Sequence, residues 1–160
     1  MTLSALALLL DYFRKQKEEI SKIYAEIKIS KEKMGKKEIV YTAYLLHNLY
    51  CASEDLFKEV AKTFENQFND STQYHKELLK KMTLSAVGIR PPLLSRESYL
   101  VLDDLRAFRH VFRHGYTYEL EGEKISILKK KLSRYFHKII EDFNKFEKFL
   151  ESRLASEMKL

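Results

Sequence analysis

The chain has 160 residues, a length that suits one domain, and we expect residues 1–160 to form a single domain. Hydrophobic residues make up 45% of the chain, enough to fill a core, whereas four Gly and two Pro argue against a loop-rich protein and favour an all-helical one. The formal net charge of +6 fits a phosphate-bearing partner, although many helical bundles carry a mild basic excess without one.

Two features of the sequence indicate the cellular compartment of the protein. Cys51 is the single cysteine, so it cannot form an internal disulfide, and we interpret it as a small buried side chain in a reducing cytosol. The apolar start, residues 1–13, lacks a basic n-region and is shorter than the roughly 20 apolar residues of a membrane span. We therefore predict a cytoplasmic protein with no signal peptide and no membrane contact.

Apolar residues at three- and four-residue steps predict four long helices and one short helix. Short polar connections between long amphipathic helices are typical of an antiparallel up-down bundle, so the predicted fold class is all-α. The helices are expected at residues 3–29, 38–65, 73–84 (the short one), 96–114 and 124–154. The connections are expected at residues 30–37, 66–72, 85–95 and 117–123.

The connection over residues 85–95 contains Pro91–Pro92, which excludes helix. Ser95 is the expected N-cap of the next helix, and one of residues 70–72 is the expected N-cap of the short helix. Arg90 precedes the prolines, where it either supports a phosphate site or forms a surface salt bridge.

The helix predicted over residues 96–114 has a charged side and an apolar side. Phe108 and Phe112 lie on the apolar side and can enter a core, and Gly115 is the expected C′ residue, which leaves Tyr116 just beyond the helix end. A row of like charge repels itself, so an external anion should benefit from it. Within an arc of roughly 140° lie the five basic side chains Arg106, Arg109, His110, Arg113 and His114.

Three histidines lie outside this helix, and two of them, His47 and His75, lie on the helices predicted over residues 38–65 and 73–84. His47, on the apolar helix over residues 38–65, is more often a satisfied boundary histidine than a catalytic one. His75, on the short helix, is more often a surface or packing residue, and a place near an active groove is the alternative. The sequence alone leaves both alternatives open.

The spacing of Arg109, His114 and Tyr116 is the R-x4-H-x-Y signature of the HEPN superfamily, and the chain resembles the HepT-like ribonuclease toxins in that superfamily. Residues 72–120 resemble one HepT-like subgroup nearly throughout, in the segments YHKELL, GIRPP and LRAFRHVFRHGY. The first 70 residues resemble the family only as two helices of suitable length. The resemblance implies the HEPN fold and a homodimer in which the motif helices of two subunits line one groove.

The resemblance further implies a metal-independent endoribonuclease, the toxin of a type II toxin–antitoxin module, and we expect no cofactor. A histidine can act as acid or base near neutrality, which fits His114, and an arginine can grip phosphate oxygens, which fits Arg109. Tyr116 would hydrogen-bond in the site or stack on a base. The residues expected to strengthen binding of the RNA phosphates are Arg106, His110 and Arg113. The basic cluster indicates phosphate recognition in general, and RNA follows only from the resemblance.

A partner protein is also implied by the resemblance. HepT-like toxins are typically encoded beside MntA, a small nucleotidyltransferase antitoxin that silences them by transferring AMP to the motif tyrosine. That tyrosine corresponds to Tyr116. An adenylylated tyrosine would bring phosphate charge and bulk into a cationic groove, where it would block RNA.

Two other functions compete with this one. A non-catalytic HEPN-type binding module could dock a nucleotidyltransferase partner or nucleic acid, with Asp103 or Asp104 pairing structurally with Arg106 or Arg109.

The i,i+4 spacing of His110 and His114 also matches that of zinc-binding histidine pairs. The flanking arginines, Arg109 and Arg113, disfavour a cation there, and Asp103 is the only further ligand on that side of the helix. We therefore predict no metal site.

Overall fold

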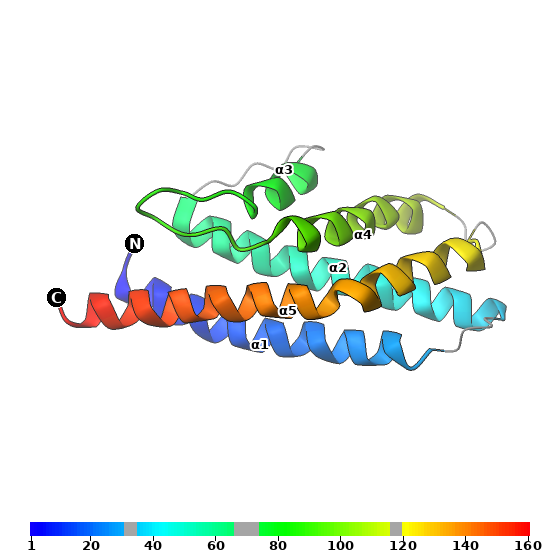
Figure 1. Cartoon of the computed structure of the whole chain (residues 1–160), viewed down its shortest axis with the longest axis horizontal. Coiled ribbons are helices and arrows are strands. Elements are labelled where there is room, and N and C mark those ends of the chain that lie inside the picture. Colours follow the sequence, from blue (N-terminus) through cyan, green and yellow to red (C-terminus); the bar gives the residue numbers. More distant parts are fainter. Residues whose placement is uncertain (31–34, 66–73, 116–119) are drawn as a thin grey trace.

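The computed structural model describes residues 1–30, 35–65, 74–115 and 120–160. Figure 1 shows the four long helices side by side with alternating directions and the short α3 packed over α2 and α4, with both chain termini at one end of the bundle. The described residues form the helices α1 (Leu3–Lys28), α2 (Lys36–Glu65), α3 (Tyr74–Lys81), α4 (Arg96–His114) and α5 (Gly122–Met158). The prediction of an all-α bundle with four long helices and one short helix is confirmed.

The predicted bounds of α1, α2 and α4 agree with the structure to within two residues. The short helix α3 ends three residues earlier than predicted, because the carbonyl of Met82 accepts hydrogen bonds from the backbone amides of Leu93 and Leu94 instead of continuing the helix. Helix α5 extends beyond the predicted range at both ends, and its last turn carries the ion pair between Arg153 and Glu157. The caps expected at residues 70–72 lie outside the described residues.

Aromatic rings from three helices form the centre of the core. Phe13 of α1 stacks on Phe146 of α5, with ring centroids 5.6 Å apart, and meets Phe143 edge to face at 5.9 Å. Phe57 of α2 packs against Phe143 from the other side. All four rings are almost fully buried, so the apolar stripes that predict the helices also join them.

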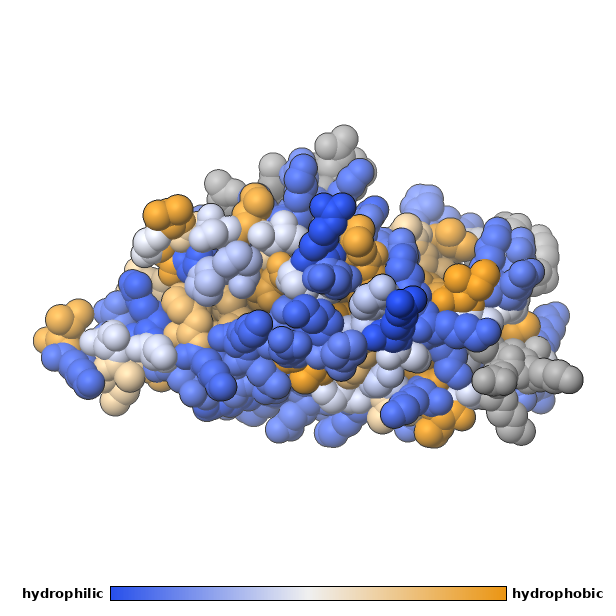
Figure 2. Space-filling view, viewed as in Figure 1, coloured by the Kyte–Doolittle hydropathy of each residue, from blue (hydrophilic) through white to orange (hydrophobic). Residues whose placement is uncertain are grey.

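Charged residues make up 32% of the chain, and hydrophilic side chains accordingly cover most of the face shown in Figure 2, whereas hydrophobic ones gather there in small groups. Among the described residues, no helix has an apolar stretch long enough to cross a lipid bilayer.

The connection between α3 and α4 is fixed by Arg90, which forms a salt bridge as one of its two alternatives predicts, but inside the protein and not at the surface. Arg90 is only 4% exposed, and its guanidinium donates to Glu65 Oε1 and to the carbonyls of Leu84 and Lys81. Its donors are therefore committed inside the protein, where they cannot bind a phosphate or form a surface ion pair. The tight turn before it uses Gly88 in the left-handed conformation, with φ of 75°.

Helix α4 begins at Ser95, as predicted. The Ser95 hydroxyl oxygen accepts a hydrogen bond from the backbone amide of Ser98 at 3.4 Å. The amide and hydroxyl of Ser95 also donate to Asp142 Oδ2 on α5, at 2.8 and 2.7 Å. The cap therefore links the start of α4 to a buried carboxylate of α5.

We expect Ser95→Ala to lower the free energy of unfolding by about 1–2 kcal/mol, because α4 loses its N-cap acceptor and Asp142 loses a donor. Urea denaturation followed by far-UV circular dichroism measures the change. The matched control is Ser152→Ala, an exposed serine on α5, which should change the stability by less than about 0.5 kcal/mol. Equal effects of the two substitutions would contradict the assigned role of Ser95.

Candidate functional site

The motif helix α4 packs against α2, α3 and α5 along one side. Val101 and Leu105 are fully buried, and Phe108 and Phe112 are half-buried against the core, so the predicted apolar side of the helix is confirmed. The helix ends at Gly115, also as predicted. However, the backbone of Gly115 is extended, with φ of −91° and ψ of 154°, and not in the left-handed conformation common for a C′ glycine.

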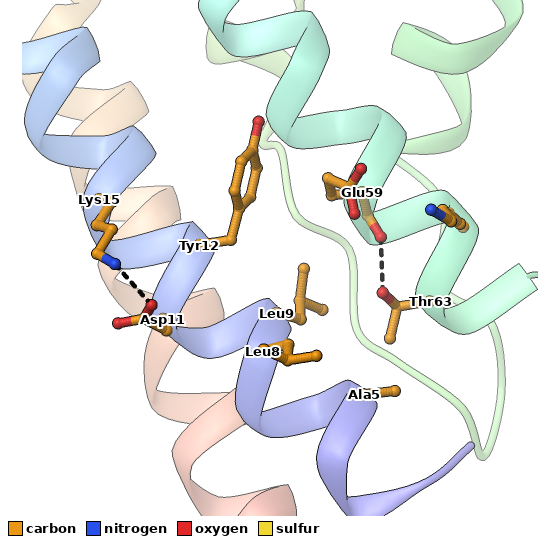
Figure 3. Close-up of a pocket in the computed structure, with 9 residues that line it drawn as sticks. Ala5, Leu8, Leu9, Asp11, Tyr12, Lys15, Glu59 and Thr63 are labelled. Atoms are coloured by element: carbon orange, nitrogen blue, oxygen red, sulfur yellow. Dashed lines mark hydrogen bonds and ion pairs between the residues drawn. The ribbon is translucent and has the colours of Figure 1, made fainter.

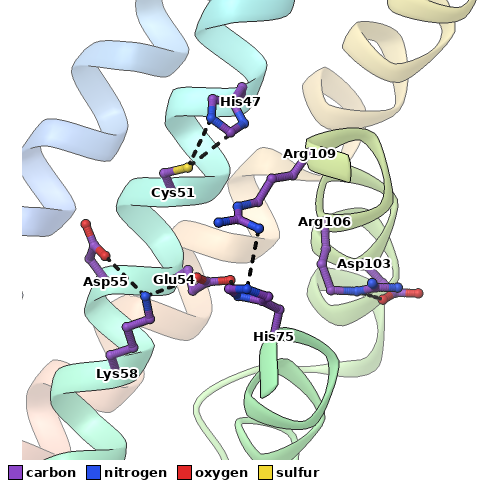
Figure 4. A network of polar contacts seen from close by, with 9 residues as sticks. All are labelled: His47, Cys51, Glu54, Asp55, Lys58, His75, Asp103, Arg106 and Arg109. Carbon is purple, nitrogen blue, oxygen red and sulfur yellow. Dashed lines mark hydrogen bonds and ion pairs between the residues drawn. The ribbon is translucent and has the colours of Figure 1, made fainter. Parts of the chain in front are cut away.

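The five basic side chains of α4 do not form the single exposed row that the helical arc suggests. Arg109 is half-buried and extends toward α2 and α3 (Figure 4), where its Nη1 lies 3.4 Å from His75 Nε2. Its Nε is buried and has no hydrogen-bond partner among the described residues. The reason is positional: Arg109 follows the fully buried Leu102 by two helical turns and so lies on the same line of the helix.

Other basic groups on α4 face solvent. His110, Arg113 and His114 are exposed, and the imidazole rings of His110 and His114 lie 4.5 Å apart between centroids. Arg106 is half-buried and pairs with Asp103 at 2.8 Å, which confirms one of the structural ion pairs considered above. Asp104 pairs with Lys131 of α5 instead of an arginine of its own helix.

Behind Arg109 lies a cluster of polar side chains on α2 and α3 that we call the Glu54 cluster: Tyr50, Glu54, Lys58 and His75. Glu54 is 3% exposed, and its Oε2 lies 2.8 Å from His75 Nδ1 while its Oε1 lies 3.2 Å from Lys58 Nζ. The hydroxyl of the buried Tyr50, one turn earlier on α2, also lowers the pKa of Glu54. His75 is therefore neither a plain surface residue nor a plain packing residue, because it joins a buried carboxylate to Arg109.

His47 lies one turn before Cys51 on α2 and packs on Phe112 of α4, with ring centroids 4.7 Å apart. Burial, together with the positive charges of Arg109 and Arg113, lowers the pKa of His47 below its ordinary value. Burial likewise raises the pKa of the Cys51 thiol, although Arg109 opposes this, so Cys51 is a half-buried thiol at neutral pH and not a thiolate. His47 thus has the boundary position expected for it, close to the motif arginines.

The third motif residue, Tyr116, lies outside the described residues. Among the residues that are described, no group of three or more His, Cys, Asp or Glu side chains is placed to hold a metal ion.

Two cavities border α2. One of about 640 Å³ lies between α1 and α2 (Figure 3) and is lined by residues that include Leu8, Tyr12 and Glu59, none of which belongs to the motif helix or the Glu54 cluster. A second, of about 560 Å³, has Phe112 in its lining together with Tyr41 and Tyr44 of α2. Only the second cavity adjoins α4.

Sequence reasoning missed the Glu54 cluster, although the sequence contains a signal for it. On α2, Glu54 falls four residues after Tyr50 and three before Phe57, which places a carboxylate within the apolar stripe. A buried charge requires partners, so this position predicts a polar contact from another helix. The apolar stripe of α2 does not indicate which residue that partner is.

The fold and the site together define an all-helical bundle whose fourth helix carries a basic, histidine-bearing face above a buried polar cluster. A family model described as "HepT-like protein" matches residues 41–150. The chain therefore belongs to the HepT-like family, as the motif and the segments around it predict. The match begins within α2, well before the stretch from residue 72 that carries the resemblance. Neither the curated proteins nor the solved structures contain a match to the chain.

We expect an NMR titration of His47 to give a pKa below the ordinary 6.5 of histidine. In Arg113→Gln this pKa should rise, because one of the two positive charges that oppose protonation is removed. The control Lys148→Gln makes the same change of charge at an exposed position near the C-terminal end of α5 and should leave the pKa of His47 in place. An equal shift in both variants would contradict a specific effect of Arg113.

The same shift predicts a pH dependence of stability. Because the folded state binds the His47 proton less tightly than the unfolded state, this residue's contribution to stability is intact above about pH 6.5 and is lost as the pH falls toward the folded-state pKa. In His47→Gln, the free energy of unfolding should fall less steeply between pH 7 and pH 5.5. Chemical denaturation at several pH values measures the two slopes, and identical slopes would contradict the lowered pKa.

Proposed function

We propose that this protein is a metal-independent endoribonuclease and the toxin of a HepT/MntA-like type II toxin–antitoxin module. The observation that supports this most directly concerns α4 of this HepT-like bundle. His114 and Arg113 are exposed to solvent, whereas Arg109 is half-buried and contacts His75. The exposed groups can reach a large substrate, and the braced arginine can meet a phosphate in a fixed orientation.

RNA cleavage without a metal has three requirements. A base takes the proton from the ribose 2′-hydroxyl, positive groups stabilise the phosphate in the transition state, and an acid protonates the leaving 5′ oxygen. In this proposal His114 is the acid or base, and Arg109 holds the phosphate. Arg106, His110 and Arg113 add positive potential along the path of the RNA.

The proposal includes the homodimer that the family resemblance implies, and the way that one subunit spreads these groups supports it. On α4, Arg109 and His114 are separated by an angle of roughly 140° about the helix axis. The structure agrees with that separation, since Arg109 extends toward α2 and α3 whereas His114 is exposed. Two motif helices that face each other would bring the diverging groups to one groove, and the two copies of His114 would supply base and acid.

The proposed control of the activity is adenylylation. An MntA-like nucleotidyltransferase would transfer AMP to Tyr116, which follows α4 directly after Gly115 in the sequence. The added phosphate would pair with the basic groups of α4 and occupy the groove that RNA needs.

A second candidate function is a non-catalytic module that binds a nucleotidyltransferase or nucleic acid. It is favoured by one observation, that Arg106 is paired with Asp103 and Arg109 with protein groups, as structural residues would be. Such a module would bind RNA without turnover, and Arg113→Ala would weaken that binding more than His114→Ala.

We expect the purified protein, in EDTA, to cleave total RNA, and His114→Ala to reduce the rate roughly 100-fold or more, since an acid or base is lost. The matched control is His137→Ala, an exposed histidine on α5, which should cleave at the native rate. All three proteins should have the same circular dichroism and the same affinity for RNA.

Loss of cleavage on addition of EDTA would overturn the metal-independent mechanism. Absence of cleavage in all three proteins would leave either the binding module or a protein already adenylylated. The intact mass of the same sample separates these, because adenylylation adds the mass of one AMP group, and an unmodified inactive protein would overturn the proposed enzyme.

A further inference from the structure

The Glu54 cluster contacts Arg109, the residue that would hold the phosphate in the proposed reaction. Glu54 Oε2 lies 2.8 Å from His75 Nδ1, and His75 Nε2 lies 3.4 Å from Arg109 Nη1 (Figure 4). We propose that His75, oriented by Glu54, is a positioning residue that holds the Arg109 guanidinium in the orientation in which it meets phosphate. That Arg109 binds phosphate rests on the proposed function, whereas the contact of His75 with Arg109 does not.

Glu54 is the fixed end of this chain of contacts. Burial raises the pKa of Glu54, but the Tyr50 hydroxyl, His75 and Lys58 outweigh burial and hold that pKa below its ordinary value. Glu54 is therefore a carboxylate at neutral pH, and a carboxylate can only accept hydrogen bonds. With Lys58 and His75 in contact with a side chain that is 3% exposed, it has little freedom to move.

The carboxylate determines the tautomer of His75. Because Glu54 only accepts, the contact at 2.8 Å requires the hydrogen of the imidazole on Nδ1. The group that faces Nε2 is Arg109 Nη1, which can only donate, so the contact at 3.4 Å is a hydrogen bond in the tautomer whose lone pair is on Nε2. The two contacts are therefore complementary: one aligns the ring and the other uses the aligned ring to orient the arginine.

Such an anchor matters for Arg109 because its side chain is long and has many rotamers. Ordering an arginine side chain costs rotamer entropy, and a contact made before substrate binds removes that cost from the binding step. The contact to His75 leaves other N–H groups of the five-donor guanidinium for phosphate oxygens. A preorganised cation of this kind stabilises a transition state better than a mobile one.

Two substitutions at position 75 separate the two contacts. In His75→Asn, the amide nitrogen takes the place of Nδ1 and donates to Glu54, but nothing reaches Arg109. His75→Gln instead places the amide oxygen near the position of Nε2, where it accepts from Arg109, and the contact to Glu54 is weakened. The matched controls are His137→Asn and His137→Gln at the exposed α5 histidine.

We expect kcat for RNA cleavage to fall roughly 100-fold in His75→Asn and less than about 10-fold in His75→Gln, with smaller changes in KM, because loss of orientation acts mainly on the transition state. Stability should follow the opposite order, since His75→Asn keeps the buried carboxylate satisfied and His75→Gln does not. A purely structural role of His75 would instead make activity follow stability. Where the native protein cleaves RNA, equal activity of the two variants, whether high or low, would overturn the proposal.

A second readout needs no catalysis and so separates this proposal from the proposed function. Arg109 is one of the charges that lower the pKa of His47, so displacement of its guanidinium should raise that pKa in His75→Asn but not in His75→Gln. An unchanged His47 titration in His75→Asn would overturn the positioning role even if the protein cleaves no RNA. If His75→Asn does not fold, Glu54→Gln replaces it, because loss of the charge releases the tautomer, and it too should raise the pKa of His47.

Discussion

A buried carboxylate is the constraint on which the rest of this structure depends. Glu54 lies within the apolar stripe of α2, and a charge removed from water must be surrounded by donors or it destabilises the fold. Tyr50 and Lys58 come from the same helix, one turn before and one turn after. The remaining donor, His75, comes from α3, so satisfaction of this one carboxylate requires a second helix in a defined place.

That requirement explains how an eight-residue helix is held in the bundle. A helix as short as α3 is not stable by itself, and its stability comes from tertiary contacts. Leu78 and Leu79 bury its apolar side, and the contact between His75 and Glu54 fixes its orientation. With α3 in place, an imidazole nitrogen faces α4 at the level of Arg109. The contact between His75 and Glu54 therefore fixes both the packing of α3 and the group that Arg109 contacts.

The sequence was a good guide wherever a local pattern decides the outcome. Apolar periodicity predicted every helix, and Ser95 and Gly115 marked the ends of α4, because these features depend on neighbours in the chain. It was a poor guide to Arg90 and Arg109. The helical arc gives the angle at which the Arg109 side chain leaves α4, but not which group its guanidinium reaches. The partners of both arginines lie on other elements, where local sequence does not indicate them. Glu54 interrupts a predictable stripe, yet His75 lies 21 residues away and no local rule pairs the two.

The distribution of charge around α4 follows from the same contacts. Arg109, half-buried, has the carboxylate of Glu54 behind His75, and this anion offsets the cost of a cation in that place. Arg113 and His114 have no carboxylate partner among the described residues and face solvent, so their positive potential is directed outward. The helix thus combines a cation that the protein holds still with basic groups that an external phosphate can approach. A site for phosphate chemistry needs both, because orientation without access or access without orientation would leave the anion unbound or misaligned.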